Sequence, residues 1–170
     1  MNFIELATKR WSCRSYSDRP VEQEKIDTII EAARLAPTAV NFQPVRVWVL
    51  KSPEALEKVR QTTRSYFGAP VVFLVGCQPE QAWVRRFDEH TGAEVDAAII
   101  ATYLMNEATD LGLDTLWVGS FDPALVHALF PETVGYELVA QIHTGYAAAD
   151  AVPSPRHAIR KSREDFAVEL

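Results

Sequence analysis

Hydrophobic and polar positions along this chain repeat at two spacings, one typical of helices and one typical of strands. Apolar residues three and four apart predict a helix over residues 22–35. Asn2 and Glu5 form a capping-box pair, which predicts a short helix at the start of the chain. A serine–proline pair at residues 52–53 predicts the cap and first turn of another helix, which reaches about residue 64.

Strand-like segments lie between these helices. Residues 45–50 predict one strand, and the nearly unbroken apolar run over residues 70–77 is typical of a strand buried on both faces. Residues 115–119 predict a short strand, and alternation over residues 138–145 predicts the last one. The segment 78–92 shows no clear period, so we expect a surface excursion there.

The longest predicted helix runs from Ala93 to Leu111 and is apolar on nearly every face, as expected of a central helix that ends at Gly112. Its apolar surface exceeds what one face of such a domain should need to cover. We therefore expect part of it to pack against a second chain. A further helix is predicted over residues 122–131, and after Asp150 the chain becomes an extended tail rich in proline and cations.

Composition predicts a single globular domain over residues 1–170. The 170 residues are 48% hydrophobic and 24% charged, which suffices for a core without disulfide or metal staples. No apolar run approaches the roughly 20 residues of a membrane span, and the first five residues lack the pattern of a signal peptide. Two isolated cysteines, Cys13 and Cys77, fit a reducing compartment, so the expected location is cytoplasmic.

The positions of the charged residues are more informative than the net charge of the chain. A net charge of −6 argues against nucleic acid as a partner, because such binding depends on cations that contact phosphates. Eight of the 17 lysines and arginines nevertheless lie in two short segments, 9–19 and 156–163. Two such clusters would repel each other in a folded chain unless an anion lay between them. They are either two solvated basic patches or two ends of a site for a phosphate-bearing ligand.

Several common signatures do not occur in the sequence. The dinucleotide fingerprint G-x-G-x-x-G, the Walker phosphate loop and the hydrolase G-x-S-x-G are absent. The four histidines lack the spacing of metal ligands, so we expect no metal site. An enzyme without a conspicuous set of catalytic side chains depends on a cofactor for its chemistry.

Four segments, in order along the chain, resemble motifs of the nitroreductase family of flavin enzymes. Residues 10–14 (RWSCR) are similar to its R-x-S-x-R start, and residues 36–44 (APTAVNFQP) to its A-P-[ST]-x-x-N-x-Q-P loop. Residues 112–119 (GLDTLWVG) look like its G-L-G-T-x-W-[IV]-G segment, with an aspartate in place of a glycine. The pair at 145–146 (GY) and residues 160–162 (RKS) are similar to its closing G-Y and R-K-P.

The resemblance implies an α+β domain in which helices sandwich a mixed, mainly antiparallel sheet, and an intertwined homodimer with two FMN molecules at its interface. The phosphate of FMN would be the anion between the two basic clusters, reached by the extended tail of residues 150–170. By family position, the FMN-binding residues would be Arg10, Trp11, Ser12, Arg14, Pro37, Thr38, Asn41, Gln43, Trp117, Val118, Gly119, Arg160 and Lys161.

The resemblance also implies a role for each of these groups. Arg10 and Ser12, with Arg160 and Lys161 from the tail, would bind the phosphate and ribityl side. Arg156 or Arg163 could replace Arg160 there. Arg14 would lie near N1 of the flavin ring, where a fixed cation stabilises the negative charge of the reduced ring.

The remaining predicted residues would surround the ring. Asn41 and Gln43 would present amides to its edge, or are simply turn residues before a strand. The segment 37–38 would approach the flavin of the partner subunit. Residues 117–119 would contribute mainly backbone near N5 and O4, although Trp117 could equally be a packing residue.

The predicted function is that of an FMN-dependent oxidoreductase. NAD(P)H would reduce the flavin at N5, leave, and be replaced by a small acceptor such as a nitroaromatic, a quinone or an enone. No catalytic side chain is expected beyond the electrostatic role of Arg14. Two alternatives stay open: a flavin enzyme of this fold without a nicotinamide donor (a dehydrogenase, dehalogenase or flavin-fragmenting enzyme), and a non-enzymatic flavin-binding protein.

Overall fold

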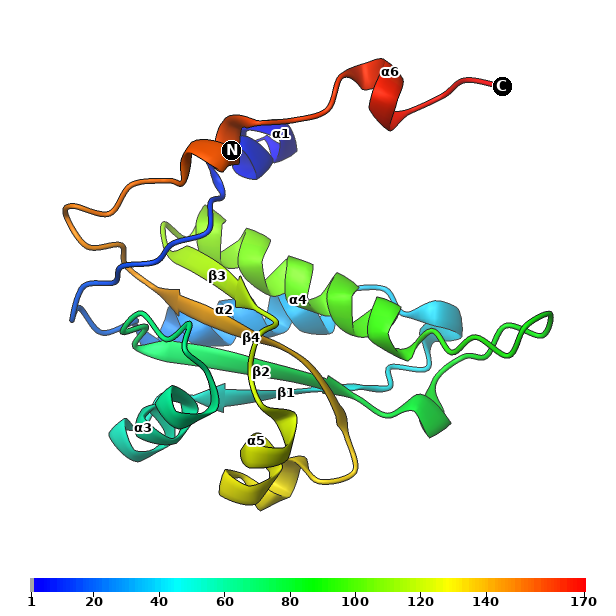
Figure 1. Cartoon of the computed structure of the whole chain (residues 1–170), viewed down its shortest axis with the longest axis horizontal. Helices are drawn as coiled ribbons and strands as arrows, with labels where there is room; N and C mark the ends of the chain where they lie inside the picture. Colours follow the sequence, from blue (N-terminus) through cyan, green and yellow to red (C-terminus); the bar gives the residue numbers. More distant parts are fainter. Residues whose placement is uncertain (1) are drawn as a thin grey trace.

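A four-stranded antiparallel sheet forms the centre of the molecule (Figure 1). The computed structural model describes residues 2–170. The sheet order is β1-β2-β4-β3. Its strands are β1 (Val45–Leu50), β2 (Val71–Cys77), β3 (Asp114–Val118) and β4 (Glu137–Gly145). The predicted, mainly antiparallel sheet is confirmed. The sheet is not mixed, however, because the described residues form no parallel pair of strands. The parallel pairing is limited to one isolated bridge between Ser12 and Thr115.

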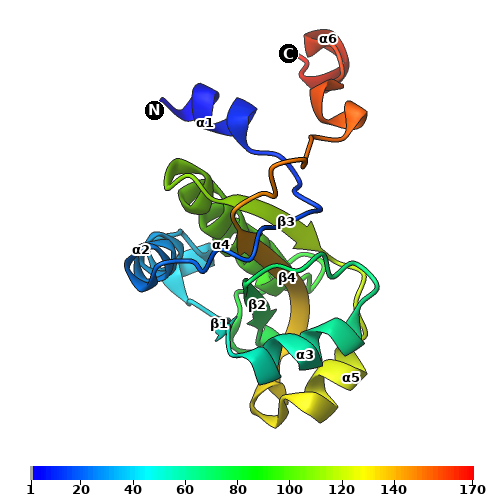
Figure 2. The same ribbon diagram turned by 90° about the vertical axis from the view of Figure 1, so that its left-hand side faces the viewer.

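Helices cover both faces of this sheet, so the predicted sandwich is also confirmed (Figure 2). On one face lie α2 (Gln23–Arg34) and α4 (Ala93–Asp110), and on the other α3 (Pro53–Thr62) and α5 (Pro123–Leu129). Each of these helices begins and ends within about two residues of the position that the sequence predicts, since caps and prolines mark the ends.

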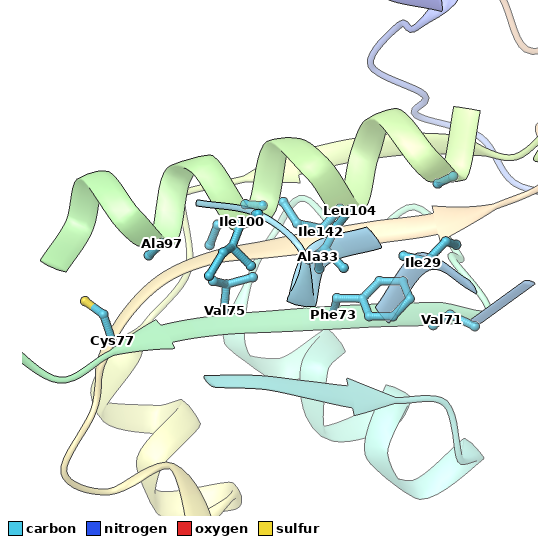
Figure 3. Packing of buried hydrophobic residues seen from close by; sticks show 14 of the residues in the cluster. Ile29, Ala33, Val71, Phe73, Val75, Cys77, Ala97, Ile100, Leu104 and Ile142 are labelled. Atoms are coloured by element: carbon cyan, nitrogen blue, oxygen red, sulfur yellow. The ribbon is translucent and has the colours of Figure 1, made fainter. Parts of the chain in front are cut away.

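Strand β2 explains how one run of apolar residues serves two cores. Val71, Phe73 and Val75 pack with α2 and α4 (Figure 3), whereas Val72 and Leu74 pack with α3 and α5. Side chains alternate between the faces of a strand, so a strand covered on both faces must be apolar at every position. All seven residues of β2 are buried, as the sequence predicts.

The segment between β2 and α4 is a surface excursion, as expected. It contains a short turn, η2 (Pro79–Gln81), and then a hairpin closed by a bridge between Val84 and Thr91. Phe87 near the tip is 97% exposed.

Both terminal segments lie on the same side of the sheet and project away from it, and α6 lies farther out than α1 (Figures 1 and 2). The first helix, α1 (Phe3–Lys9), has the predicted capping box and no buried residue. The tail is not extended throughout. It forms two short helical turns, η4 (Pro155–Ala158) and α6 (Arg163–Phe166), each capped by the serine before it. Within residues 2–170, no helix is both long and apolar enough to span a membrane.

Candidate functional site

The two basic clusters meet in the folded chain and line one hollow of about 280 Å³. Its lining contains four arginines, two serines, a histidine and no carboxylate. These residues are Arg10, Ser12, Arg14, Ser154, Arg156, His157 and Arg160. The fold therefore brings together charges that repel one another, instead of dispersing them into solvent. The chemistry of such a lining is that of an anion site.

Arg10 shows the repulsion directly. The pKa of its guanidinium lies below the ordinary value, first because the side chain is partly buried and second because of the positive charge of Arg160. A guanidinium keeps its proton even so, which leaves two cations facing each other. A phosphate between them would accept hydrogen bonds from both and offset the repulsion.

Alternation along an extended segment explains the R-x-S-x-R spacing. After α1 ends, Trp11 and Cys13 turn inward and pack in a small cluster with Tyr16. Successive side chains of an extended chain point to opposite sides, so Arg10 and Ser12 turn outward into the hollow. The Cys13 amide donates a hydrogen bond of 2.9 Å to the Thr115 carbonyl and so attaches the segment to the outer edge of β3.

The tail supplies the opposite wall. Residues 15–17 pair with residues 146–148 beyond β4, and Nε2 of His157 lies 3.3 Å from the Thr8 carbonyl oxygen of α1. The Arg160 guanidinium donates to the carbonyls of His157 and Ile159. Pairing with the N-terminal segment thus returns the tail to the arginines near the start of the chain.

The structure distinguishes between the tail cations that the sequence left open. Arg156 and Arg160 both line the hollow, so they are not alternatives to each other. Arg163 pairs instead with Glu169 at 3.0 Å, and Lys161 is exposed and outside the lining. Sequence reasoning missed Ser154 and His157. The only local signal for Ser154 is its position as the cap before Pro155.

The predicted loop of residues 37–43 lies elsewhere. Asn41 and Gln43 adopt left-handed backbone angles, φ 57° and 55°, which cost a residue other than glycine about 1 kcal/mol. The Thr38 hydroxyl accepts a hydrogen bond from the Gln43 amide at 3.0 Å, and the buried Asp96 of α4 accepts one from the Ala39 amide at 2.9 Å. Asp96 was missed by sequence reasoning, and it helps to hold this strained loop.

One chain does not bring the loop and the hollow together. The loop is attached near the first turn of α4, through Asp96. The hollow is lined by Ser12, which bridges to Thr115 of β3, and β3 follows the last turn of α4 (Figure 1). At 1.5 Å per residue, the helix between these points spans about 20 Å. The predicted residues therefore form two separate groups within a single chain.

The third predicted group, residues 117–119, lies at an edge of the sheet. Trp117 is half-buried and packs against the main core, which agrees with the packing alternative. The Thr115 carbonyl points to the outer edge of β3, where Cys13 donates to it. Strand alternation then directs the backbone of Trp117 to the same open edge, and that of Val118 toward β4, whereas Gly119 lies beyond the end of the strand.

Comparisons with known proteins agree with these motifs. The model of the nitroreductase family matches residues 7–65 and 60–146. Over 124 residues the chain is 31% identical to a candidate NADH dehydrogenase/NAD(P)H nitroreductase of Methanothermobacter thermautotrophicus, covering 71% of this chain and 62% of that protein. Over 133 residues it is 32% identical to an FMN reductase [NAD(P)H] of Bacillus subtilis, covering 69% and 53%. The matches thus span half to three-fifths of these relatives.

Solved structures match over nearly the whole chain. A nitroreductase family protein of Clostridium difficile has a TM-score of 0.91 and 34% identity, with 99% of this chain and 98% of that chain covered. A candidate nitroreductase of Exiguobacterium sibiricum, solved in complex with FMN, has a TM-score of 0.85 and 20% identity, with 100% and 98% covered. At this lower identity the second likeness bears on the fold alone.

Proposed function

Because the chain belongs to the nitroreductase family, we propose that it is an FMN-dependent oxidoreductase that uses NAD(P)H to reduce a small organic acceptor. The acceptor would be a nitroaromatic, a quinone or an enone. The observation that carries the proposal is the hollow in which Arg10, Arg156 and Arg160 gather without a carboxylate. The FMN reductase of Bacillus subtilis, similar to this chain over part of its length, supports the choice of flavin and donor.

The lining fits the phosphate end of FMN. Arg10 and Arg160 would donate charge-assisted hydrogen bonds to the phosphate oxygens, and the hydroxyls of Ser12 and Ser154 would add neutral ones. A hollow of about 280 Å³ lies at the lower limit of ligand pockets, which suits one end of the cofactor rather than all of it. The ring would lie over the neighbouring surface.

FMN supplies the redox chemistry when bound, as an acceptor and donor of hydride. In this proposal the protein positions the ring and stabilises its charge. Arg14 lines the hollow beside Ser12 and donates a 3.2 Å hydrogen bond to the Ser12 carbonyl, which restricts its guanidinium. A fixed cation there would favour the negative charge that the ring gains on reduction. The outward backbone of Trp117, with Gly119 beyond the end of β3, would provide hydrogen-bonding groups at the ring edge.

A second copy of the chain would complete the site. The loop of residues 37–43 and the hollow are separated by most of α4, so one chain alone does not bring all of the predicted residues to one cofactor. Helix α4 also leaves apolar surface uncovered, with Val95 54% and Tyr103 41% exposed. A groove of about 500 Å³, lined in part by Tyr103 and Phe3, runs between α4 and α1. We propose a homodimer in which each hollow receives the loop of the partner.

Turnover tests the proposal. Purified protein loaded with FMN should oxidise NADH or NADPH in the presence of a quinone or nitroaromatic acceptor, and the protein stripped of flavin should not. A loaded protein that oxidises neither nucleotide with any acceptor class would favour the enzymes of this fold that need no nicotinamide. A flavin that no donor reduces would favour a non-enzymatic flavin-binding protein.

A further inference from the structure

A single carboxylate outside the basic hollow bonds the two segments that lead into its walls. Asp114 is the first residue of β3 and is half-buried. Its Oδ1 accepts a 2.7 Å hydrogen bond from the indole Nε1 of Trp11, and its Oδ2 accepts a 3.2 Å hydrogen bond from the backbone amide of Ala147. Asp114 is also the residue that stands where the resemblance predicts a glycine.

Each of these bonds holds a segment that carries residues of the hollow. Trp11 lies between Arg10 and Ser12, so fixing its indole fixes the backbone from which both neighbours project. Ala147 is the second residue of the stretch that leads from β4 to Ser154 and the tail arginines. The carboxylate therefore joins the backbone of the N-terminal wall to the stretch that leads to the tail, beside the pairing of residues 15–17 with residues 146–148.

The path of the chain beside Asp114 is itself restricted. Gly145 lies opposite Asp114 in the pairing of β3 with β4. A Cβ atom on Gly145 would lie 2.5 Å from Cδ of Pro70, so only glycine lets the chain pass there and deliver the Ala147 amide. Asp114 thus contacts a backbone whose course is already determined.

We propose that Asp114 is a positioning residue of the FMN site, which holds the two basic walls at the separation that the phosphate requires. The inference rests on the proposed function. This role predicts the opposite of what charge alone predicts, because the negative charge of Asp114 close to the phosphate would by itself weaken FMN binding. Charge alone predicts that removing Asp114 tightens FMN binding, whereas positioning predicts that it weakens binding.

Titration with FMN and with riboflavin, which lacks the phosphate, separates these two effects. Asp114→Ala should raise the Kd for FMN about tenfold, equal to about 1.4 kcal/mol, and change that for riboflavin less than threefold. Asp114→Asn keeps one acceptor oxygen, so its Kd for FMN should lie between those of the Asp114→Ala and native proteins. The matched control is Asp150→Asn, which removes an exposed charge that makes no hydrogen bond or ion pair among the described residues; both its Kd values should equal the native ones.

A second variant keeps the test decisive if the alanine protein folds poorly. Trp11→Phe removes one donor and leaves the carboxylate in place, and it should raise the Kd for FMN about threefold. Thermal unfolding without flavin shows whether each variant is folded. The inference is overturned if folded Asp114→Ala, or Trp11→Phe where alanine does not fold, binds FMN as tightly as the native protein, or loses FMN and riboflavin equally. A native protein that binds neither flavin contradicts the proposed function itself.

Discussion

At the scale of single residues, the hollow depends on like charges that the fold forces together. Arg10 and Arg160 come from opposite ends of the chain, and partial burial together with the positive charge of Arg160 lowers the pKa of Arg10. Such an arrangement stabilises a ligand more than it stabilises the fold. The chemistry of the site can therefore be tested one side chain at a time.

Arg10→Ala should weaken FMN binding by about 10- to 100-fold, because a charge-assisted hydrogen bond contributes about 1.5–3 kcal/mol. The contact is partly exposed, so added salt should screen it in the native protein. The difference in FMN affinity between the native and Arg10→Ala proteins should therefore be smaller at higher salt. Arg163→Ala is the matched control, since that arginine pairs with Glu169 and lies outside the hollow. Flavin fluorescence titrations at two salt concentrations measure both variants. Equal affinities for Arg10→Ala and the native protein would exclude Arg10 from the site.

Arg14→Gln should lower the midpoint potential of bound FMN by roughly 30–60 mV. The change removes a charge-assisted contact of about 1.5–3 kcal/mol from the reduced ring, and ~1.4 kcal/mol corresponds to ~30 mV for a two-electron couple. Arg14→Lys keeps the charge but loses the planar guanidinium, so its midpoint potential should lie between those of the native and Arg14→Gln proteins. Equilibrium reduction against a reference dye gives the potentials. Identical values in fully loaded native and Gln proteins would leave Arg14 a binding role only.

Local and distant contacts differ in how far the sequence predicts them. Arg10, Ser12 and Arg14 were predicted from the resemblance of residues 10–14 to the family motif, and alternation in an extended segment explains their spacing. Asp96 and Asp114 could not be predicted as anchors, because their partners lie 57 and 103 residues away along the chain. Only the fold brings those atoms within hydrogen-bond distance.

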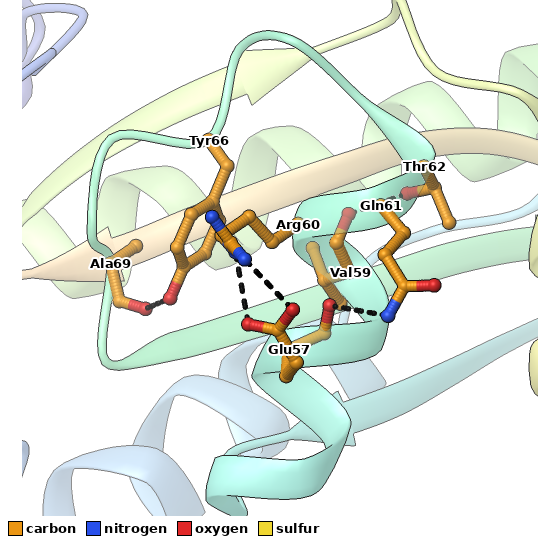
Figure 4. A network of polar contacts seen from close by, with 7 residues as sticks. All are labelled: Glu57, Val59, Arg60, Gln61, Thr62, Tyr66 and Ala69. Carbon is orange, nitrogen blue, oxygen red and sulfur yellow. Dashed lines mark hydrogen bonds and ion pairs between the residues drawn. The ribbon is translucent and has the colours of Figure 1, made fainter.

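At the scale of elements, a buried series of side-chain hydrogen bonds joins β4 to the end of α3. His143 and Gln141 share one face of β4, and the Gln141 amide donates to the Thr62 hydroxyl at 3.0 Å. Thr62 in turn donates to the Val59 carbonyl at 2.8 Å, at the α3 end drawn in Figure 4. The remaining Gln141 oxygen must therefore accept from Nε2 of His143, 3.2 Å away. Nδ1 of His143 is left buried without a hydrogen-bond partner.

This arrangement predicts loss of stability in mild acid. Burial lowers the pKa of His143 from 6.5 to about 4, because a proton on Nδ1 would be a buried donor without an acceptor. Below pH 6.5 the unfolded chain binds that proton and the folded protein does not. The free energy of unfolding should thus fall by about 3 kcal/mol as pH drops from 6.5 to 4.

Urea unfolding at several pH values measures this loss. His143→Gln should unfold with a much smaller dependence on pH between 6.5 and 4, whatever its absolute stability. His127→Gln is the control, since that histidine contacts Thr133 and takes no part in the hydrogen bonds that join His143 to Thr62. A native pH dependence that His143→Gln leaves unchanged would contradict the assignment to this side chain.

Regular elements were predicted closely, and the tail was not. Caps at Asn2 and Ser52 and the proline at 123 mark helix ends locally, so periodicity and capping suffice for them. The tail was predicted as extended, yet Ser154 and Ser162 each cap a short helical turn. Such turns are too short for a periodic pattern to reveal them.

At the scale of the whole molecule, the proposed site needs a second chain, because one chain holds the loop of residues 37–43 and the hollow apart. Ends that lie away from the sheet and a central helix with exposed Val95 and Tyr103 both leave surface for a partner. The native protein should therefore be a dimer near twice 19.0 kDa by sedimentation. A flavin-bound monomer would contradict the shared site.

Mixed dimers test the sharing itself. One chain would carry Arg10→Ala and the other Asn41→Gly, which keeps the left-handed backbone and removes only the amide. In a shared arrangement one site of the mixed dimer has both changes and the other has neither. One FMN should then bind with native affinity, although both parent homodimers bind weakly. No site of native affinity would appear if each chain built its own site.

In the proposed function, electrons pass from a nicotinamide nucleotide to an acceptor through bound FMN. The most direct test is anaerobic rapid mixing of the FMN-loaded protein with NADH or NADPH while flavin absorbance is followed. We predict that one of the nucleotides bleaches the flavin within the turnover time, and that a quinone or nitroaromatic then restores its colour without a second addition of donor. Flavin that stays oxidised with both nucleotides, in protein shown to be folded and fully loaded, would contradict the proposed function.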